Sequence, residues 1–208
     1  MLGAAQPDAS YESLVDFSLG KRNEVLARLR GTLFGESLGI YLDCPKCGLR
    51  QEFSLRTEIF SAPKAGEETG NAVEVEGFRF RPVTTRDLAA VVNERDPHQA
   101  ALLMAKSCCL SDGTDPHWTD EFLEKVEDSL GEADPAADIE LEFACNGCGR
   151  GWRENFDIVD YLWEEIEVRA MRLIREVHGL ASAYGWTESE ILSLSRERRN
   201  LYLEMAGV

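Results

Sequence analysis

The sequence contains two nearly identical cysteine motifs that lie 101 positions apart. CPKCG occupies residues 44–48 and CNGCG occupies residues 145–149. A Cys-x-x-Cys turn places two sulfur atoms on one side of a metal ion, and structural zinc takes four such ligands. We therefore expect the four cysteines of the two motifs to hold one structural zinc ion. These expected metal ligands are Cys44, Cys47, Cys145 and Cys148.

Each motif also has the same kind of flanking sequence. Apolar residues alternate before the first motif, over Ile40–Leu42, and before the second, over Leu141–Phe143. Phe53–Leu55 follows the first motif and Phe156–Ile158 follows the second, each expected as a return strand. We therefore expect each motif to be the turn of a β-hairpin, with a glycine of positive φ after its second cysteine.

Two such hairpins facing each other would form a zinc ribbon, and the chain between them would be an insertion. A long insertion is tolerable because loop-closure entropy grows only logarithmically with length. We expect an α+β fold, a four-cysteine zinc ribbon with a long α/β insertion between its two knuckles and a helical C-terminal segment. The expected parts are an N-terminal helical segment (1–38), the ribbon halves (39–57 and 138–156), the inserted subdomain (58–137) and the C-terminal helices (157–208).

Apolar periodicity and capping residues predict the remaining elements. Two short strands are expected near residues 73–75 and 78–80, after a loop over residues 63–70. Helices are expected over residues 11–17, 21–34, 97–110, 120–130 (ended by Gly131) and 196–205, from Thr84 or Thr85 through Val92, from Asp157 through Tyr184, and after Thr187.

The charge of the chain limits its partners. There are 22 Lys and Arg against 38 Asp and Glu, which gives a net charge of −16. A surface this negative repels phosphate backbones and anionic lipid. The N-terminus does not read as a signal peptide, and no stretch has the length of a membrane span. We expect a cytoplasmic location, where paired Cys-x-x-Cys motifs are metal ligands rather than disulfides.

The sequence gives no sign of catalysis. It has no phosphate-binding glycine loop, no nucleophile elbow and no HExxH motif. A site closed by four cysteines holds structure and activates no water. We therefore expect no enzyme, no catalytic residues and no small-molecule substrate. A metalloenzyme stays as a third alternative, and it would need an open coordination position.

The other metal-binding residue types have simpler explanations. Cys108 and Cys109 are adjacent, and they could join a second site or oxidise, but we favour burial of at least one on an apolar helix face. The three histidines, His98, His117 and His178, share no ligand spacing, and we expect them at the surface or in helix packing.

Two features bear on the kind of partner. Residues 115–142 contain eleven Asp and Glu and one Lys, which we interpret as a solvated face rather than as a docking surface for a basic partner. We expect most apolar positions of the long C-terminal helix to pack in the core, but the helix is apolar on more than one side and can therefore also meet a partner protein. The motifs are only mildly basic, so a zinc-ribbon nucleic-acid-binding or transcription-associated factor is the alternative rather than the leading hypothesis.

Several segments together resemble a known family. They are GKRNEVLARLRGTLFG, DCPKCG with EFSL, FRFRPVTTRDLAAV, ACNGCGRGWRENFDIVDYLWEEIE and REVHGLASAYGWTESEILSLSRERRNLYLEM. They resemble the baseplate hub assembly chaperones of contractile-tailed phages, in the zinc-ribbon form associated with phage-tail-like contractile injection systems. The resemblance covers most of residues 18–206 and is clearest in the C-terminal tail. Comparable members of that family lack the cysteines, so the metal is not diagnostic of the role.

The resemblance implies a cytosolic assembly chaperone or adaptor whose partners are hub or spike subunits of a contractile baseplate. A non-enzymatic role of this kind agrees with the closed metal site and the acidic composition.

Overall fold

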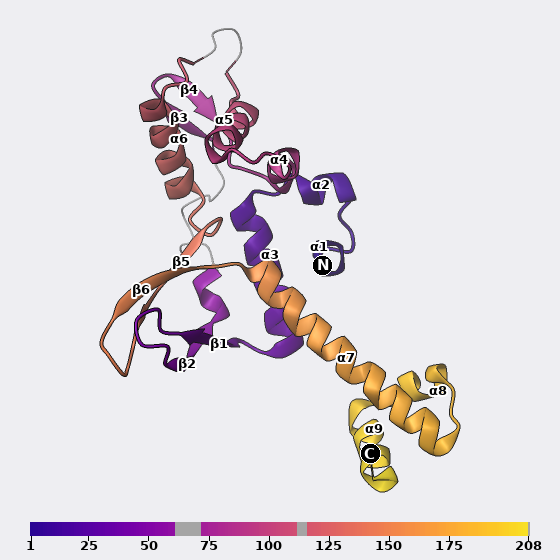
Figure 1. Cartoon of the computed structure of the whole chain (residues 1–208). Coiled ribbons are helices and arrows are strands. Elements are labelled where there is room, and N and C mark those ends of the chain that lie inside the picture. Colours follow the sequence, from indigo (N-terminus) through magenta and orange to yellow (C-terminus); the bar gives the residue numbers. More distant parts are fainter. Residues whose placement is uncertain (61–71, 112–115, 208) are drawn as a thin grey trace. The chain divides into compact units, whose positions relative to one another are not determined.

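The computed structural model describes residues 1–60, 72–111 and 116–207 (Figure 1). Over these residues the chain is a mixture of helices and three two-stranded antiparallel sheets. It divides into two compact units, Met1–Ile158 and Val159–Val208, which are described separately below. The loop expected over residues 63–70 lies outside the described residues.

Three helices begin the first unit. They are α1 (Leu2–Ala5), α2 (Tyr11–Val15) and α3 (Leu19–Phe34), of which α1 has no counterpart among the expected elements. The Oγ atom of Ser18 accepts a hydrogen bond from the Lys21 N–H at 3.2 Å and so caps α3. The helix stops at Gly35, which has a φ of +91°.

Two β-hairpins follow the repeat in the sequence. The first joins β1 (Ser37–Asp43) to β2 (Arg50–Arg56), and the second joins β5 (Ile139–Ala144) to β6 (Gly151–Phe156). Every pair of the second hairpin is the corresponding pair of the first shifted by 101 residues. The two hairpins therefore have the same register.

One expected strand position is wrong. The residue that corresponds to Leu55 is Phe156, which is the last residue of β6, and Ile158 is already the first residue of the long helix α7. The expected return strand over Phe156–Ile158 is therefore displaced, and the strand is Gly151–Phe156 instead. Distance from the cysteine turn decides where the strand ends, and the apolar residue type alone does not show it.

The chain between the hairpins builds a core of its own. It comprises the 3₁₀ helix η1 (Thr57–Phe60), β3 (Val73–Val75), β4 (Phe78–Phe80), α4 (Thr85–Val91), α5 (Pro97–Cys108) and α6 (Asp120–Ala133). Strand and helix side chains pack together in this core, and the buried members are Val75, Phe80, Ala105, Cys108, Phe122 and Val126.

The helix α6 extends beyond its expected end. Gly131 was expected to stop it, but the helix continues to Ala133 and the Asp134 N–H donates to the Leu130 carbonyl at 3.0 Å. Pro135 follows, and proline disfavours helical backbone in the residue before it. Proline therefore explains the end of this helix better than glycine does.

The start of α3 contacts the insertion on both sides of its three helices α4, α5 and α6. The Leu19 N–H donates to the Val83 carbonyl at 2.9 Å, just before α4. The Gly20 N–H donates to Oδ2 of Asp134 at 2.9 Å, just after α6. The buried Asn23 adds a bond from Nδ2 to the Ala136 carbonyl at 2.8 Å. These bonds attach the insertion to the N-terminal helix at two points.

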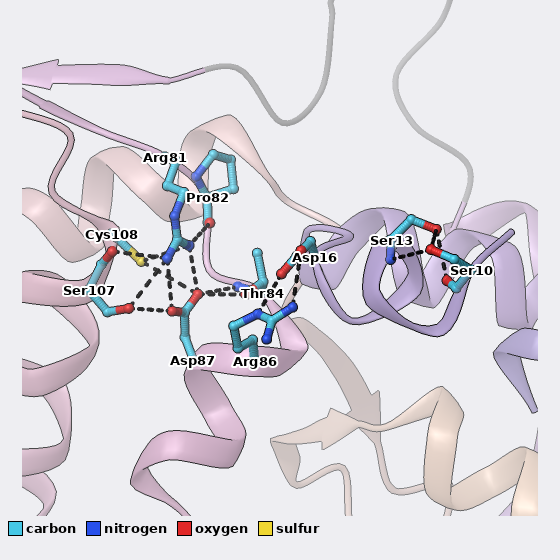
Figure 2. A network of polar contacts seen from close by, with 10 residues as sticks. All are labelled: Ser10, Ser13, Asp16, Arg81, Pro82, Thr84, Arg86, Asp87, Ser107 and Cys108. Carbon is cyan, nitrogen blue, oxygen red and sulfur yellow. Dashed lines mark hydrogen bonds and ion pairs between the residues drawn. The ribbon is translucent and has the colours of Figure 1, made fainter.

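A polar network supports the helices of the insertion (Figure 2). Arg81 donates to both carboxylate oxygens of Asp87, at 2.7 and 2.9 Å. Asp87 also accepts from the Thr84 N–H at 2.8 Å and from the Ser107 hydroxyl at 2.5 Å. The Asp87 side chain is buried, so these donors replace water around a charged group. The network connects the start of α4 to the end of α5.

The second unit is helical. It contains most of α7 (Ile158–Tyr184), together with α8 (Glu188–Ser193) and α9 (Arg196–Ala206), which fold back beside the end of α7 (Figure 1). The expected capping box of α8 is present, with Thr187 and Glu190 as its two residues. Among the described residues, no helix combines the length and hydropathy needed to cross a bilayer.

The contacts between α7 and α9 are partly polar and partly aromatic. Arg199 is buried and its Nε donates to Glu176 at 3.0 Å. The rings of Tyr184, Trp186 and Tyr202 pack with centroids 4.7 to 5.8 Å apart. Arg199 therefore stabilises the helical hairpin.

We predict that Asp87→Asn destabilises the protein by about 3 kcal/mol, at the low end of the range for losing one partner of a buried ion pair, because Arg81 stays partly exposed. Arg81, Ser107 and Thr84 outweigh burial and lower the pKa of the Asp87 carboxyl. A depressed pKa in the folded state adds stability that is present above the unfolded pKa of about 4 and is lost as the pH falls. Urea unfolding of both proteins from neutral to acid pH measures this.

The control is Asp16→Asn, in the same view (Figure 2). Asp16 pairs with Arg86 at 2.7 Å, but both side chains are more than half exposed. This substitution should leave the unfolding midpoint nearly unchanged. Equal effects of the two substitutions, or an Asp87→Asn protein with an unchanged acid transition, would contradict the role given to the network.

Candidate metal centre

The two cysteine turns have the same backbone conformation. In the first, the Gly48 N–H donates to the Cys44 carbonyl at 2.9 Å and the Cys44 N–H donates to the Leu49 carbonyl at 3.0 Å. The second turn repeats both bonds at 2.9 and 2.8 Å. Gly48 and Gly149 have φ values of +70° and +68°, as expected for these positions. Glycine is favoured there because other residues rarely adopt a positive φ.

The structure brings the four expected ligands to one point. Their sulfur atoms all lie within 4.8 Å of one another, a group that could hold a metal ion. Two close sulfur pairs cross between the hairpins, at 3.7 Å for Cys44 and Cys148 and 3.6 Å for Cys47 and Cys145. Cys44 and Cys47 correspond to Cys145 and Cys148 in the repeat, so exchanging the two hairpins turns one pair into the other. The cluster therefore has approximate two-fold symmetry. All six cysteines of the chain are free thiols.

Other side chains hold the two hairpins together beside the sulfurs. The Phe53 ring lies 4.7 Å from the Phe143 ring and 6.2 Å from the Trp152 ring. The Asn146 N–H donates to Oε1 of Gln51 at 2.7 Å. These contacts have no signal in the sequence, because pairs about a hundred residues apart leave no local pattern.

Backbone hydrogen bonds, burial and neighbouring sulfurs give the thiols of the cluster different pKa values. The backbone N–H groups of Cys148 and Gly147 overcome burial and lower the pKa of the Cys145 thiol to about 6. The Arg150 N–H lowers the pKa of Cys148, but burial and the three neighbouring sulfurs outweigh it and raise that pKa to about 12. Four thiolates so close repel one another strongly, and a cation at their centre would remove that repulsion.

Both basic and acidic side chains are exposed near the cluster. Arg153 pairs with Glu140 at 3.1 Å and with Glu142 at 2.5 Å. The Arg50 guanidinium lies over the Tyr41 ring at 5.8 Å. The other exposed basic residues of the motifs are Lys46 and Arg150. The surface of the hairpins near the cluster is therefore mixed in charge.

The remaining cysteines and histidines lie elsewhere. Cys108 is fully buried in the core of the insertion, which confirms the expected burial of at least one of the pair. Burial raises the pKa of its thiol to about 11, so it is inert as a nucleophile or ligand. His98 forms an exposed pair with Asp120 at 3.0 Å. Neither residue belongs to the four-sulfur group.

No family model, curated protein or solved structure matches this chain. The resemblance to baseplate hub assembly chaperones therefore stays a prediction.

We predict that metal binding at the four-sulfur cluster depends steeply on pH. Thiols must lose their protons to bind a metal, so protons compete with it. If each bound metal releases at least one proton, its affinity falls about a hundredfold or more from about pH 8 to about pH 6. Chelator competition with zinc or cobalt measures it. Cys108→Ala should behave as wild type, and pH-independent binding would contradict the assignment.

Proposed function

We propose that the cluster is a structural zinc site and that the two hairpins form a zinc ribbon. A tetrahedron of sulfurs about 2.3 Å from zinc has edges of about 3.8 Å. The observed separations of 3.6 and 3.7 Å are close to that value. Two residues of each hairpin would supply the ligands, so zinc binding would add directly to the free energy of folding.

The donor set supports a role without catalysis. Four protein sulfurs would complete the coordination of zinc and leave no position for water or substrate. Among the described residues, this is the one group of three or more His, Cys, Asp or Glu side chains placed to hold a metal. The zinc would then hold together two parts of the chain that are distant in sequence, and binding would be the task of other surfaces.

The observation that carries the proposed function is an exposed apolar stripe on α7. Trp163, Met171 and Ile174 are 51%, 51% and 59% exposed. At 3.6 residues per turn they lie within about 80° of one another around the helix. Leu162 and Leu180 are fully buried and lie on another side of the same helix. An apolar stripe on a helix that is already packed elsewhere is typical of a protein-binding surface.

We infer that the protein is an assembly chaperone or adaptor that covers a surface of a partner subunit through this stripe. The resemblance described above gives the partner's class, namely the hub or spike subunits of a contractile phage tail or contractile injection system. The protein would hold such a subunit while the baseplate assembles. The net charge of −16 supports solubility of the complex and opposes a role on nucleic acid.

The zinc proposal predicts one zinc per chain in freshly purified protein. Cys148→Ser should lose the metal and at least about 3 kcal/mol of folding free energy, a fraction of the ~10 kcal/mol with which structural zinc binds small peptides. Elemental analysis and thermal unfolding measure both. Cys109→Ser is the control and should keep its zinc. A folded Cys148→Ser protein with intact stability would instead favour an open, catalytic site.

The partner proposal predicts that hub or spike subunits co-purify with the full chain. Met171→Glu with Ile174→Glu should weaken that binding by about 30-fold or more, as expected for hot-spot residues, while the unfolding midpoint stays unchanged. Arg172→Glu is the matched control, because it changes the net charge by the same −2 on another side of α7. Affinity is measured by titration with the purified partner subunit.

Two outcomes would contradict the partner proposal. One is normal particle assembly after deletion of the gene, together with no binding to any hub or spike subunit. The other is a salt-dependent mobility shift of DNA or RNA at micromolar protein, which would favour the nucleic-acid alternative.

A further inference from the structure

The unit Met1–Ile158 has an apolar pocket of about 340 Å³, separate from the cysteine cluster. It lies between α4, α5 and α6, at the point where α3 contacts the insertion. Half-buried apolar side chains line it, and they include Leu88, Ala101, Met104, Leu123 and Leu130. A cavity of about 150 Å³ holds benzene, so this one has room for one or two large side chains.

The rim of the pocket is acidic. Glu127 and Asp138 border it and are exposed, whereas Asp134 is buried and already accepts the bond from Gly20. The rim belongs to the acidic stretch 115–142, whose single basic residue is Lys125. The Lys125 ammonium group forms ion pairs with the carboxylates of Glu76 and Glu121, at N–O distances of 2.9 and 2.7 Å. No described basic side chain therefore neutralises the rim from within this stretch.

Apolar walls and an acidic rim together select one kind of occupant. We propose that the pocket docks a basic amphipathic segment of a partner protein, with one or two large apolar side chains inside and Lys or Arg beside Glu127 and Asp138. Apolar anchors would supply the affinity, and the charges would supply orientation and fast association. Met104 can adjust to different anchors because its side chain is flexible.

Part of the acidic stretch would then be a docking surface rather than a solvated face, because two of its exposed acids border an apolar pocket. The first unit would thereby add to the proposed function a binding surface distinct from the stripe on α7. Each surface can be tested while the other is intact.

The test begins with a display selection of random peptides on the zinc-loaded full chain. Enriched peptides should contain large apolar residues flanked by Lys or Arg. The rim variant Glu127→Lys with Asp138→Lys should weaken the best peptide by about tenfold or more in fluorescence anisotropy. The pocket-filling variant Ala101→Trp should abolish binding while the protein unfolds at an unchanged or higher temperature.

The matched control is Glu124→Lys with Asp128→Lys. Both residues are exposed on α6 but do not line the pocket, and both double variants change the net charge from −16 to −12. The control should weaken binding by less than about threefold. Equal losses in the two double variants would overturn the proposal, because net charge alone would then explain the binding.

The other outcomes are equally decisive. Enrichment of acidic peptides, or no enrichment, would overturn the proposal. So would self-association of the chain that Ala101→Trp abolishes, because the occupant would then be a second copy. If the rim variant still binds hub or spike subunits but fails with the peptide, the pocket serves another partner, and the proposed function is unaffected. If the rim variant retains peptide binding, this inference fails alone.

Discussion

The junction of the two cysteine hairpins is the constraint on which the first unit depends. Two hairpins of identical register meet turn to turn, and four sulfurs from both lie within 4.8 Å. Aromatic contacts and the Gln51–Asn146 bond reinforce the junction, but four unbound thiols at this spacing would repel as they ionise. A metal would turn that repulsion into the strongest link between the hairpins, and it would fix both ends of the insertion.

The insertion then folds as a structure of its own, attached to α3 by hydrogen bonds before α4 and after α6. Its core and the Arg81–Asp87 network hold α4, α5 and α6 together, and the pocket lies among these three helices. The hydrogen bonds from Leu19 and Gly20 place the N-terminus of α3 beside this pocket. A pocket that is already formed before binding lowers the entropy cost of ordering a segment there.

The helical unit offers a surface of a different kind. Its hairpin is closed by the buried Arg199–Glu176 pair and by the packed rings of Tyr184, Trp186 and Tyr202. The stripe of Trp163, Met171 and Ile174 remains exposed. The two proposed surfaces thus differ chemically: the stripe would bind by apolar burial alone, and the pocket would also select for basic charge.

The sequence by itself determined the local features of this protein. Repeated Cys-x-x-Cys-Gly motifs and alternating apolar residues predicted the hairpins, the positive φ at Gly48 and Gly149, and the set of four sulfurs, because turn chemistry and strand periodicity are local. Capping residues likewise predicted the start of α8 and α9. Two boundaries predicted from the sequence were wrong. The return strand ends at Phe156, a position set by its distance from the cysteine turn, and α6 ends before a proline rather than at Gly131. Only the tertiary structure decided which side chains share a site. The cross-hairpin sulfur pairs, the partners of Asp87 and the acidic rim of the pocket all join residues from separate elements, and packing of the whole unit sets those distances.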